Sequence, residues 1–211
     1  MEGLCYFANT IRVNLKLILQ KNNDYATIKK IMTKNIVIFD RKMNNGKGVK
    51  AANLVKIIKG LDKTKTFFFA EKSGETKEIG KELSGILKPQ KGALVFGLKG
   101  ELGAGKTTFL QGFAKGLGIK NKIISPTFVI MNRFPIKKGK FTNFYHLDCY
   151  RIEDSKEMKN LEFEEIINNS KNIVCIEWPE KIKKALPKNI NMIKFDVLEG
   201  DKRKIIIDYG E

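Results

Sequence analysis

The chain has 211 residues, with 40 lysines and arginines against 23 aspartates and glutamates, so its formal net charge is +17. Its 42% hydrophobic and 30% charged residues are typical of a globular protein and exclude the disordered and fibrous classes. No run approaches the roughly 18 apolar residues of a membrane span, and Glu2 stands where a secretory signal is basic. The three cysteines lack CxxC spacing, so neither a disulfide framework nor a zinc site is indicated, and we expect a cytoplasmic protein without membrane partners.

The positive charge is densest in the first third of the chain. Residues 1–66 hold 14 lysines and arginines against 4 acidic residues, whereas residues 67–211 hold 26 against 19. The first segment contains short apolar fragments, but no sustained period joins them and it has no chemical motif. We therefore interpret residues 1–66 as a basic N-terminal extension, poorly structured or accessory, and residues 67–211 as the functional domain.

From residue 66 onward, strands and helices can be predicted in chain order. A strand at 66–70 precedes a helix that we expect to be capped by Ser73 and to end before Pro89. The continuous apolar run at 93–98 predicts a strand buried on both faces. A glycine-rich loop then leads into a helix that is expected to stop at Gly118.

The second half of this region alternates strands and helices in the same way. The runs at 128–134 and 141–151 predict two antiparallel strands, and Asp154 with Glu157 forms a capping box for a helix from about residue 155. A buried strand at 172–178 precedes a closing hairpin built around the turn EGDK. The predicted fold is α/β: a mixed sheet resembling that of P-loop NTPases, with helices on both faces and a C-terminal antiparallel hairpin.

The segment GELGAGKT at 100–107 matches the phosphate-loop pattern G-x-x-x-x-G-K-[ST] at every position. Its glycines let the backbone approach an anion closely, so that successive N–H groups surround a phosphate. Lys106 would reach the β- and γ-phosphates, and Thr107 would offer its hydroxyl to Mg²⁺ at the start of a helix. The segment therefore predicts a site for a nucleoside triphosphate with Mg²⁺.

A P-loop enzyme also needs a carboxylate at the end of a neighbouring strand. Glu177 ends the run NIVCIE in a Walker B pattern, and Asp148 in YHLDCYR is the second candidate; which of them holds the metal stays open. Thr127 ends the motif SPT, which is either a nucleotide-sensing switch loop or an ordinary turn. We expect His146 to be structural and to face the opposite side of its strand from Asp148.

Five segments occur in a fixed order: GELGAGKTTFLQGFAKGLGI, SPTFVIMNRF, FYHLDCYRIED, LEFEEI and CIEWPEKI. In this combination the chain resembles the TsaE (YjeE) family from about residue 67 to its C-terminus. The resemblance implies binding of ATP and Mg²⁺ and weak ATP hydrolysis by the protein alone. It also implies work with the TsaB–TsaD pair, which transfers a threonylcarbamoyl group to adenosine 37 of tRNAs that read ANN codons, so that tRNA is reached through the complex.

The resemblance further implies roles for individual residues. The implied metal ligands are Thr107, Glu177 and Asp148, and the implied catalytic residues are Lys106, Asp148, Glu177 and Thr127. The implied nucleotide-binding residues are Ser73, Gly100, Glu101, Leu102, Gly103, Ala104, Gly105, Lys106, Thr107, Thr108 and Trp178. Cys149 departs from the family pattern, in which a larger apolar residue is usual.

Two other functional classes remain open when the residues are considered alone. A P-loop small-molecule kinase needs an arginine-bearing lid, but the chain has only five arginines and no lid-sized segment carries several. A direct nucleic-acid binder would explain the positive charge. Deletion of residues 1–66 separates these possibilities, and we expect ATP turnover and tRNA modification to persist without them.

Overall fold

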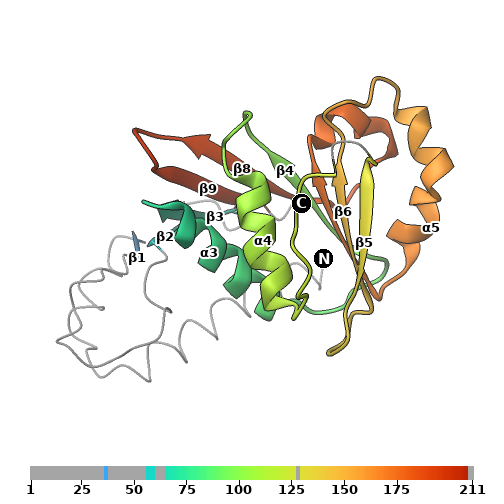
Figure 1. Ribbon diagram of the computed structural model, residues 1–211, viewed down its shortest axis with the longest axis horizontal. Coiled ribbons are helices and arrows are strands. Elements are labelled where there is room, and N and C mark those ends of the chain that lie inside the picture. The colour runs from blue at the N-terminus through green and yellow to red at the C-terminus, as the bar shows by residue number, and fades with distance from the viewer. Residues whose placement is uncertain (1–35, 38–55, 60–64, 127–128, 209–211) are drawn as a thin grey trace.

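The computed structural model describes residues 36–37, 56–59, 65–126 and 129–208, which form one mixed sheet flanked by helices (Figure 1). The described strands are β1 (Ile36–Val37), β2 (Lys56–Lys59), β3 (Lys65–Ala70), β4 (Leu94–Lys99), β5 (Met131–Pro135), β6 (Asn143–Asp148), β7 (Asn172–Glu177), β8 (Asn191–Val197) and β9 (Arg203–Asp208). The described helices are α3 (Ser73–Gly85), α4 (Lys106–Gly116) and α5 (Phe163–Asn168), with 3₁₀ helices η2 (Ser155–Leu161) and η3 (Pro179–Ala185).

The strand order is β1-β2-β3-β9-β8-β4-β7-β6-β5. β4 runs parallel to both β7 and β8, and β6 runs parallel to β7. β5 pairs antiparallel with β6, and β8 pairs antiparallel with β9, as the sequence predicted for both pairs. The carboxyl ends of β4, β6 and β7 therefore meet at one edge of the sheet, which is where open α/β sheets bind their ligands.

Each central strand sends alternate side chains into two separate cores. Leu94, Phe96 and Leu98 of β4 join the core beneath α3 and α4, whereas Ala93 and Val95 join the core beneath η2, α5 and η3. A strand buried on both faces reads as a continuous apolar run, and β4 and β7 have this pattern. The prediction of a mixed sheet with helices on both faces is confirmed.

Three glycines permit close packing of α3 and α4, which lie side by side over one face of the sheet (Figure 1). A Cβ atom added to Gly112 would lie 1.8 Å from the carbonyl oxygen of Lys77, and one added to Gly80 would lie 2.3 Å from that of Phe109. At Gly116 it would lie 2.0 Å from Ser84 Oγ. The two helices approach so closely only because these positions have no side chain.

The boundaries of several elements differ from the predicted ones. Lys72, not Ser73, occupies the N-cap of α3, and it makes no side-chain capping bond. The helix predicted from residue 155 is divided into η2 and α5 by Glu162, whose φ is 52°. Its predicted capping box is confirmed, because Asp154 and Glu157 make both reciprocal bonds. β5 begins only at Met131, and residues 127–128 lie outside the described part of the chain.

Two short strands of the first 66 residues extend the sheet. β2 pairs antiparallel with β3, and β1 pairs antiparallel with β2. The division of the chain at residue 66 stays a prediction. Among the helices of the described residues, none has the length and apolar character needed to cross a membrane.

Candidate nucleotide-binding site

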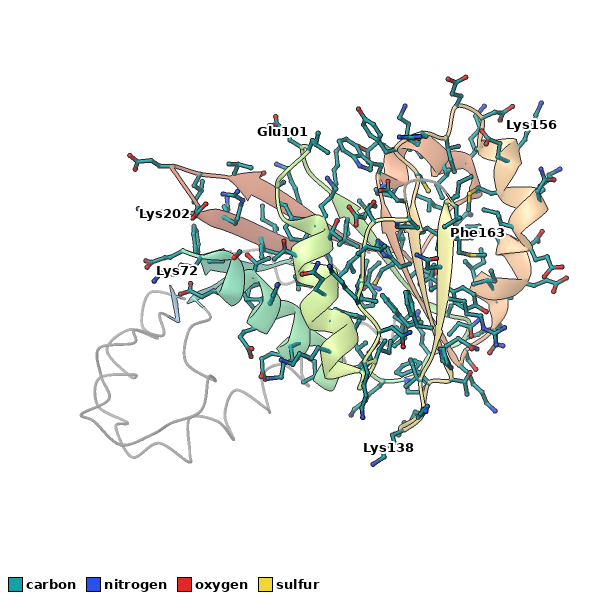
Figure 2. All side chains as sticks on the ribbon, in the orientation of Figure 1. Lys72, Glu101, Lys138, Lys156, Phe163 and Lys202 are labelled. Carbon is teal, nitrogen blue, oxygen red and sulfur yellow. The ribbon has the colours of Figure 1, made fainter. Side chains whose placement is uncertain are left out.

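The phosphate loop connects β4 to α4 at the edge where the parallel strands end. Figure 2 shows Glu101 at the tip of this loop, at the opposite end of the molecule from Lys138 on the β5–β6 turn. Gly103 and Gly105 have φ values of 76° and 99°, a region that side chains with a Cβ rarely adopt. Gly105 is also the N-cap of α4, so the helix begins directly behind the loop. This backbone sets the N-terminus of α4 directly behind the loop, an arrangement that stabilises an anion.

The lysine of the loop is held by the loop itself. Lys106 Nζ donates hydrogen bonds to the carbonyl oxygens of Gly100 at 2.8 Å and Glu101 at 2.9 Å. It also lies 4.2 Å from the centroid of the Trp178 ring. Burial lowers the pKa of Lys106 from its ordinary value of 10.5, against the opposing effect of nearby carboxylates, of which Glu177 is the strongest. A phosphate would offer this desolvated ammonium a stronger, charge-assisted partner than a carbonyl.

Glu177 accepts two contacts on the same carboxylate oxygen. The hydroxyl of Thr107 donates to Oε1 at 2.9 Å, and Nε2 of His146 lies 3.0 Å from that atom. Glu177 and His146 are both buried. Glu177 lies beside the loop at 100–107 because its strand β7 is the parallel neighbour of β4.

The expectation that His146 faces away from Asp148 is wrong. Residues two apart on a strand point to the same face, so the two side chains share a side of β6. His146 lies opposite Cys175, which belongs to the core beneath α3 and α4, and its ring reaches the acidic end of β7. Because side chains alternate faces along a strand, the sequence alone could have placed His146 on the same face of β6 as Asp148.

Asp148 lies directly beside Glu177 in the parallel register of β6 and β7. Its Oδ2 accepts a hydrogen bond from the hydroxyl of Ser125, and its Oδ1 accepts one from the backbone N–H of Tyr150 at 3.1 Å. The motif SPT is thus tied through its serine to the second carboxylate. Thr127 lies outside the described residues, so its switch role stays a prediction.

The donor set suits a magnesium ion that arrives with a nucleotide. Thr107, Glu177 and Asp148 supply one hydroxyl and two carboxylates at one edge, while the described ranges contain no group of three or more His, Cys, Asp or Glu residues able to hold a metal. Mg²⁺ typically binds through one or two carboxylates together with substrate phosphates and water, not in an all-protein cage. These residues therefore fit Mg²⁺ as the companion of a phosphate ligand.

Sequence reasoning missed two residues beside the loop. Thr76 of α3 is buried, and its methyl carbon lies 3.7 Å from where a Cβ on Gly105 would be, whereas the predicted Ser73 is exposed at the start of that helix. Arg203 of β9 donates to the carbonyl oxygen of Gly103 at 3.4 Å. A pattern in one segment does not reveal either contact, because each joins distant parts of the chain.

The comparisons with known proteins agree with this geometry. The model of the family "Threonylcarbamoyl adenosine biosynthesis protein TsaE" matches residues 70–205. The chain is 40% identical over 130 residues to a tRNA threonylcarbamoyladenosine biosynthesis protein TsaE of Rickettsia felis, covering 61% of this chain and 71% of that one. It is 37% identical over 131 residues to that of Bacillus subtilis, covering 62% and 77%. The crystal structure of Bacillus subtilis YdiB superimposes with a TM-score of 0.57 at 31% identity, covering 69% of this chain and 86% of that one. The chain, in which the glycine loop at 100–107 lies beside the end of β7, belongs to the TsaE family.

Proposed function

We propose that this protein is the ATP-binding and ATP-hydrolysing component of the cytoplasmic machinery that makes tRNA N6-threonylcarbamoyladenosine. The observation that carries the proposal is the hydrogen bond from Thr107 of the phosphate loop to Glu177, in a chain of the TsaE family. This contact joins the two parts that a P-loop enzyme uses to hold a metal and a triphosphate. The partners in this proposal are proteins of the TsaB and TsaD types, and tRNA is met through their complex.

In this proposal the residues of the site divide the work of ATP hydrolysis. Lys106 supplies positive charge to the β- and γ-phosphates, and the backbone N–H groups of residues 100–107 surround them. Mg²⁺ would be held by Thr107 with the carboxylate side of the site, and when bound it supplies charge that stabilises the transferring phosphoryl group.

Asp148 is the carboxylate better placed to orient the attacking water. Glu177 accepts through Oε1 from Thr107, the proposed hydroxyl ligand, and contacts His146, and these contacts support a role for Glu177 as the carboxylate ligand of the metal. Asp148 is bound to the loop of Ser125 and to the backbone after β6, on the neighbouring strand. The proposal therefore assigns the metal to Glu177 and the water to Asp148.

The experiment that tests the function measures ATP turnover of the full chain with and without TsaB- and TsaD-type proteins, together with threonylcarbamoyladenosine formation on a tRNA that reads ANN codons. We expect low turnover alone, strong stimulation by the partners, and loss of both activities in Lys106→Ala. Lys115→Ala is the matched control, because it removes an exposed lysine from the last turn of the same helix α4, away from the site. Stoichiometric phosphoryl transfer to a nucleoside or sugar, without stimulation by the partners, would establish the kinase alternative instead.

A further inference from the structure

His146 and Glu177 form a buried pair at the centre of the proposed site. The side chains of His146 and Glu177 are 0% and 4% exposed. They come from neighbouring parallel strands, and His146 pairs with Cys175, which stands two positions before Glu177 on β7. A buried carboxylate is costly unless hydrogen bonds replace the water that it loses. The contact between Nε2 and Oε1 at 3.0 Å is one of the two that this oxygen receives.

The hydrogen bonds determine which nitrogen of His146 carries the proton. An ionised carboxylate only accepts, so Nε2 must be the donor to Glu177. Nδ1 is buried and has no hydrogen-bond partner among the described residues. A proton on Nδ1 would therefore bury an N–H without an acceptor, which costs more than leaving a neutral nitrogen there. The network therefore favours a proton on Nε2, donated to Glu177.

The same oxygen also fixes the hydroxyl of Thr107. A hydroxyl has one hydrogen, and Thr107 donates it to Glu177, so its oxygen lone pairs remain available to a metal ion. With donors from α4 and from β6 on one oxygen, the carboxylate is held from two elements and cannot turn freely. Loss of the His146 donor would release one side of this arrangement.

We propose that His146 is a positioning residue: it holds Glu177 so that the carboxylate and the Thr107 hydroxyl are oriented for Mg²⁺ before the nucleotide binds. The proposal rests on the proposed nucleotide function. Residues that orient metal ligands from behind typically change metal affinity by about 10- to 100-fold when they are removed. His146 itself touches neither the nucleotide nor the metal in this role.

The first test uses the fact that the chain contains one histidine. In protein labelled with ¹⁵N-histidine and free of nucleotide, the imidazole spectrum reports His146 alone. We expect a proton on Nε2, which its couplings to the ring protons identify. An Nε2 without a proton, or an average of the two tautomers, would overturn the proposal whether or not the protein hydrolyses ATP.

The second test compares three variants by titrating Mg²⁺ in the presence of a non-hydrolysable ATP analogue, followed by the fluorescence of Trp178, the one tryptophan of the chain. His146→Leu removes the donor, and we expect the half-saturating Mg²⁺ concentration to rise about tenfold while affinity for the analogue without metal is unchanged. His146→Gln, which keeps a side-chain N–H, should restore most of the metal affinity.

Cys175→Ala is the packing control, because Cys175 is buried opposite His146. If Cys175→Ala loses as much metal affinity as His146→Leu, packing alone matters and the proposal is wrong. The same conclusion follows if His146→Gln loses as much as His146→Leu. Wild-type protein that binds the magnesium nucleotide but fails to hydrolyse it with its partners would defeat the proposed function and leave the positioning role standing. If His146→Leu does not fold, the imidazole spectrum of the wild type decides.

Discussion

Substitution of Gly112 by alanine should separate the two helices that carry the phosphate loop and its neighbour. The added Cβ would lie 1.8 Å from the carbonyl oxygen of Lys77, and contacts under 3.0 Å are essentially never seen. The obstacle is backbone on both sides, so α3 and α4 must move apart by at least about 1.2 Å. No side-chain rotation can relieve such a contact.

The expected loss follows from two opposing effects. Overpacking a buried contact typically costs about 1–3 kcal/mol, occasionally more, and here the clash is with rigid backbone. Alanine in a helix interior returns about 1 kcal/mol relative to glycine. We expect Gly112→Ala to lower the free energy of unfolding by about 2 kcal/mol, which corresponds to a fall of about 4–8 °C in Tm for a protein of this length.

The assay is urea unfolding followed by circular dichroism, with nucleotide affinity measured in parallel. Affinity should fall as well, because Thr76 of α3 packs beside Gly105 of the loop. Gly85→Ala is the matched control: Gly85 ends the same α3, and no atom lies within 4 Å of its added Cβ, so stability should be equal or slightly higher. A Gly112→Ala protein as stable as the Gly85→Ala protein would refute the reasoning.

Three further predictions concern charge and protonation. Burial lowers the pKa of Lys106, so in the alkaline range below 10.5 the folded protein loses a proton that the unfolded chain keeps. The free energy of unfolding of the wild type, minus that of Lys106→Met, should therefore rise with pH when both are measured by urea unfolding. A difference in unfolding free energy that falls with pH would contradict this. Burial raises the pKa of Cys149 to about 12 and that of Cys175 well above its ordinary value. In a Cys5→Ser protein, where only these two thiols remain, we expect no fast reaction with Ellman's reagent at pH 8 and two reactive thiols after unfolding. Glu177→Gln should raise the affinity for metal-free ATP and reduce the increase in ATP affinity that Mg²⁺ produces, both measured by calorimetry. A larger increase in affinity on adding Mg²⁺ would contradict the assignment of the metal to Glu177.

The conformation of the glycine loop at 100–107 could be predicted from the sequence because it depends on local residues. The glycines at 103 and 105 satisfy backbone angles within the loop itself, and the spacing to Lys106 and Thr107 is fixed by the covalent chain. The apolar runs of β4 and β7 were recognisable for a similar reason, since burial on both faces requires apolar residues at successive positions.

The contacts across the site could be predicted only in part. That Glu177 reaches Thr107 depends on β7 being the parallel neighbour of β4, and that Asp148 lies beside Glu177 depends on the register of β6 with β7. Sequence pattern names the strands but does not state their order. The close approach of α3 and α4 at Gly112 was invisible for the same reason: a helix interior glycine reads as a weak position until its partner is known.

The neighbouring carboxylates explain why a nucleotide should need a cation here. Adjacent strands lie about 4.8 Å apart, so Asp148 and Glu177 end side by side, and the hydroxyl and N–H groups that bind them stabilise their charge without cancelling it. Glu180 adds to the negative field that acts on Lys106. A triphosphate brought next to two ionised carboxylates is repelled, and one lysine with the dipole of α4 faces both sets of charges. In the proposed function, a divalent cation held by these carboxylates would turn that repulsion into attraction for the nucleotide, and the proposed orientation of Glu177 by His146 would prepare the site for that cation.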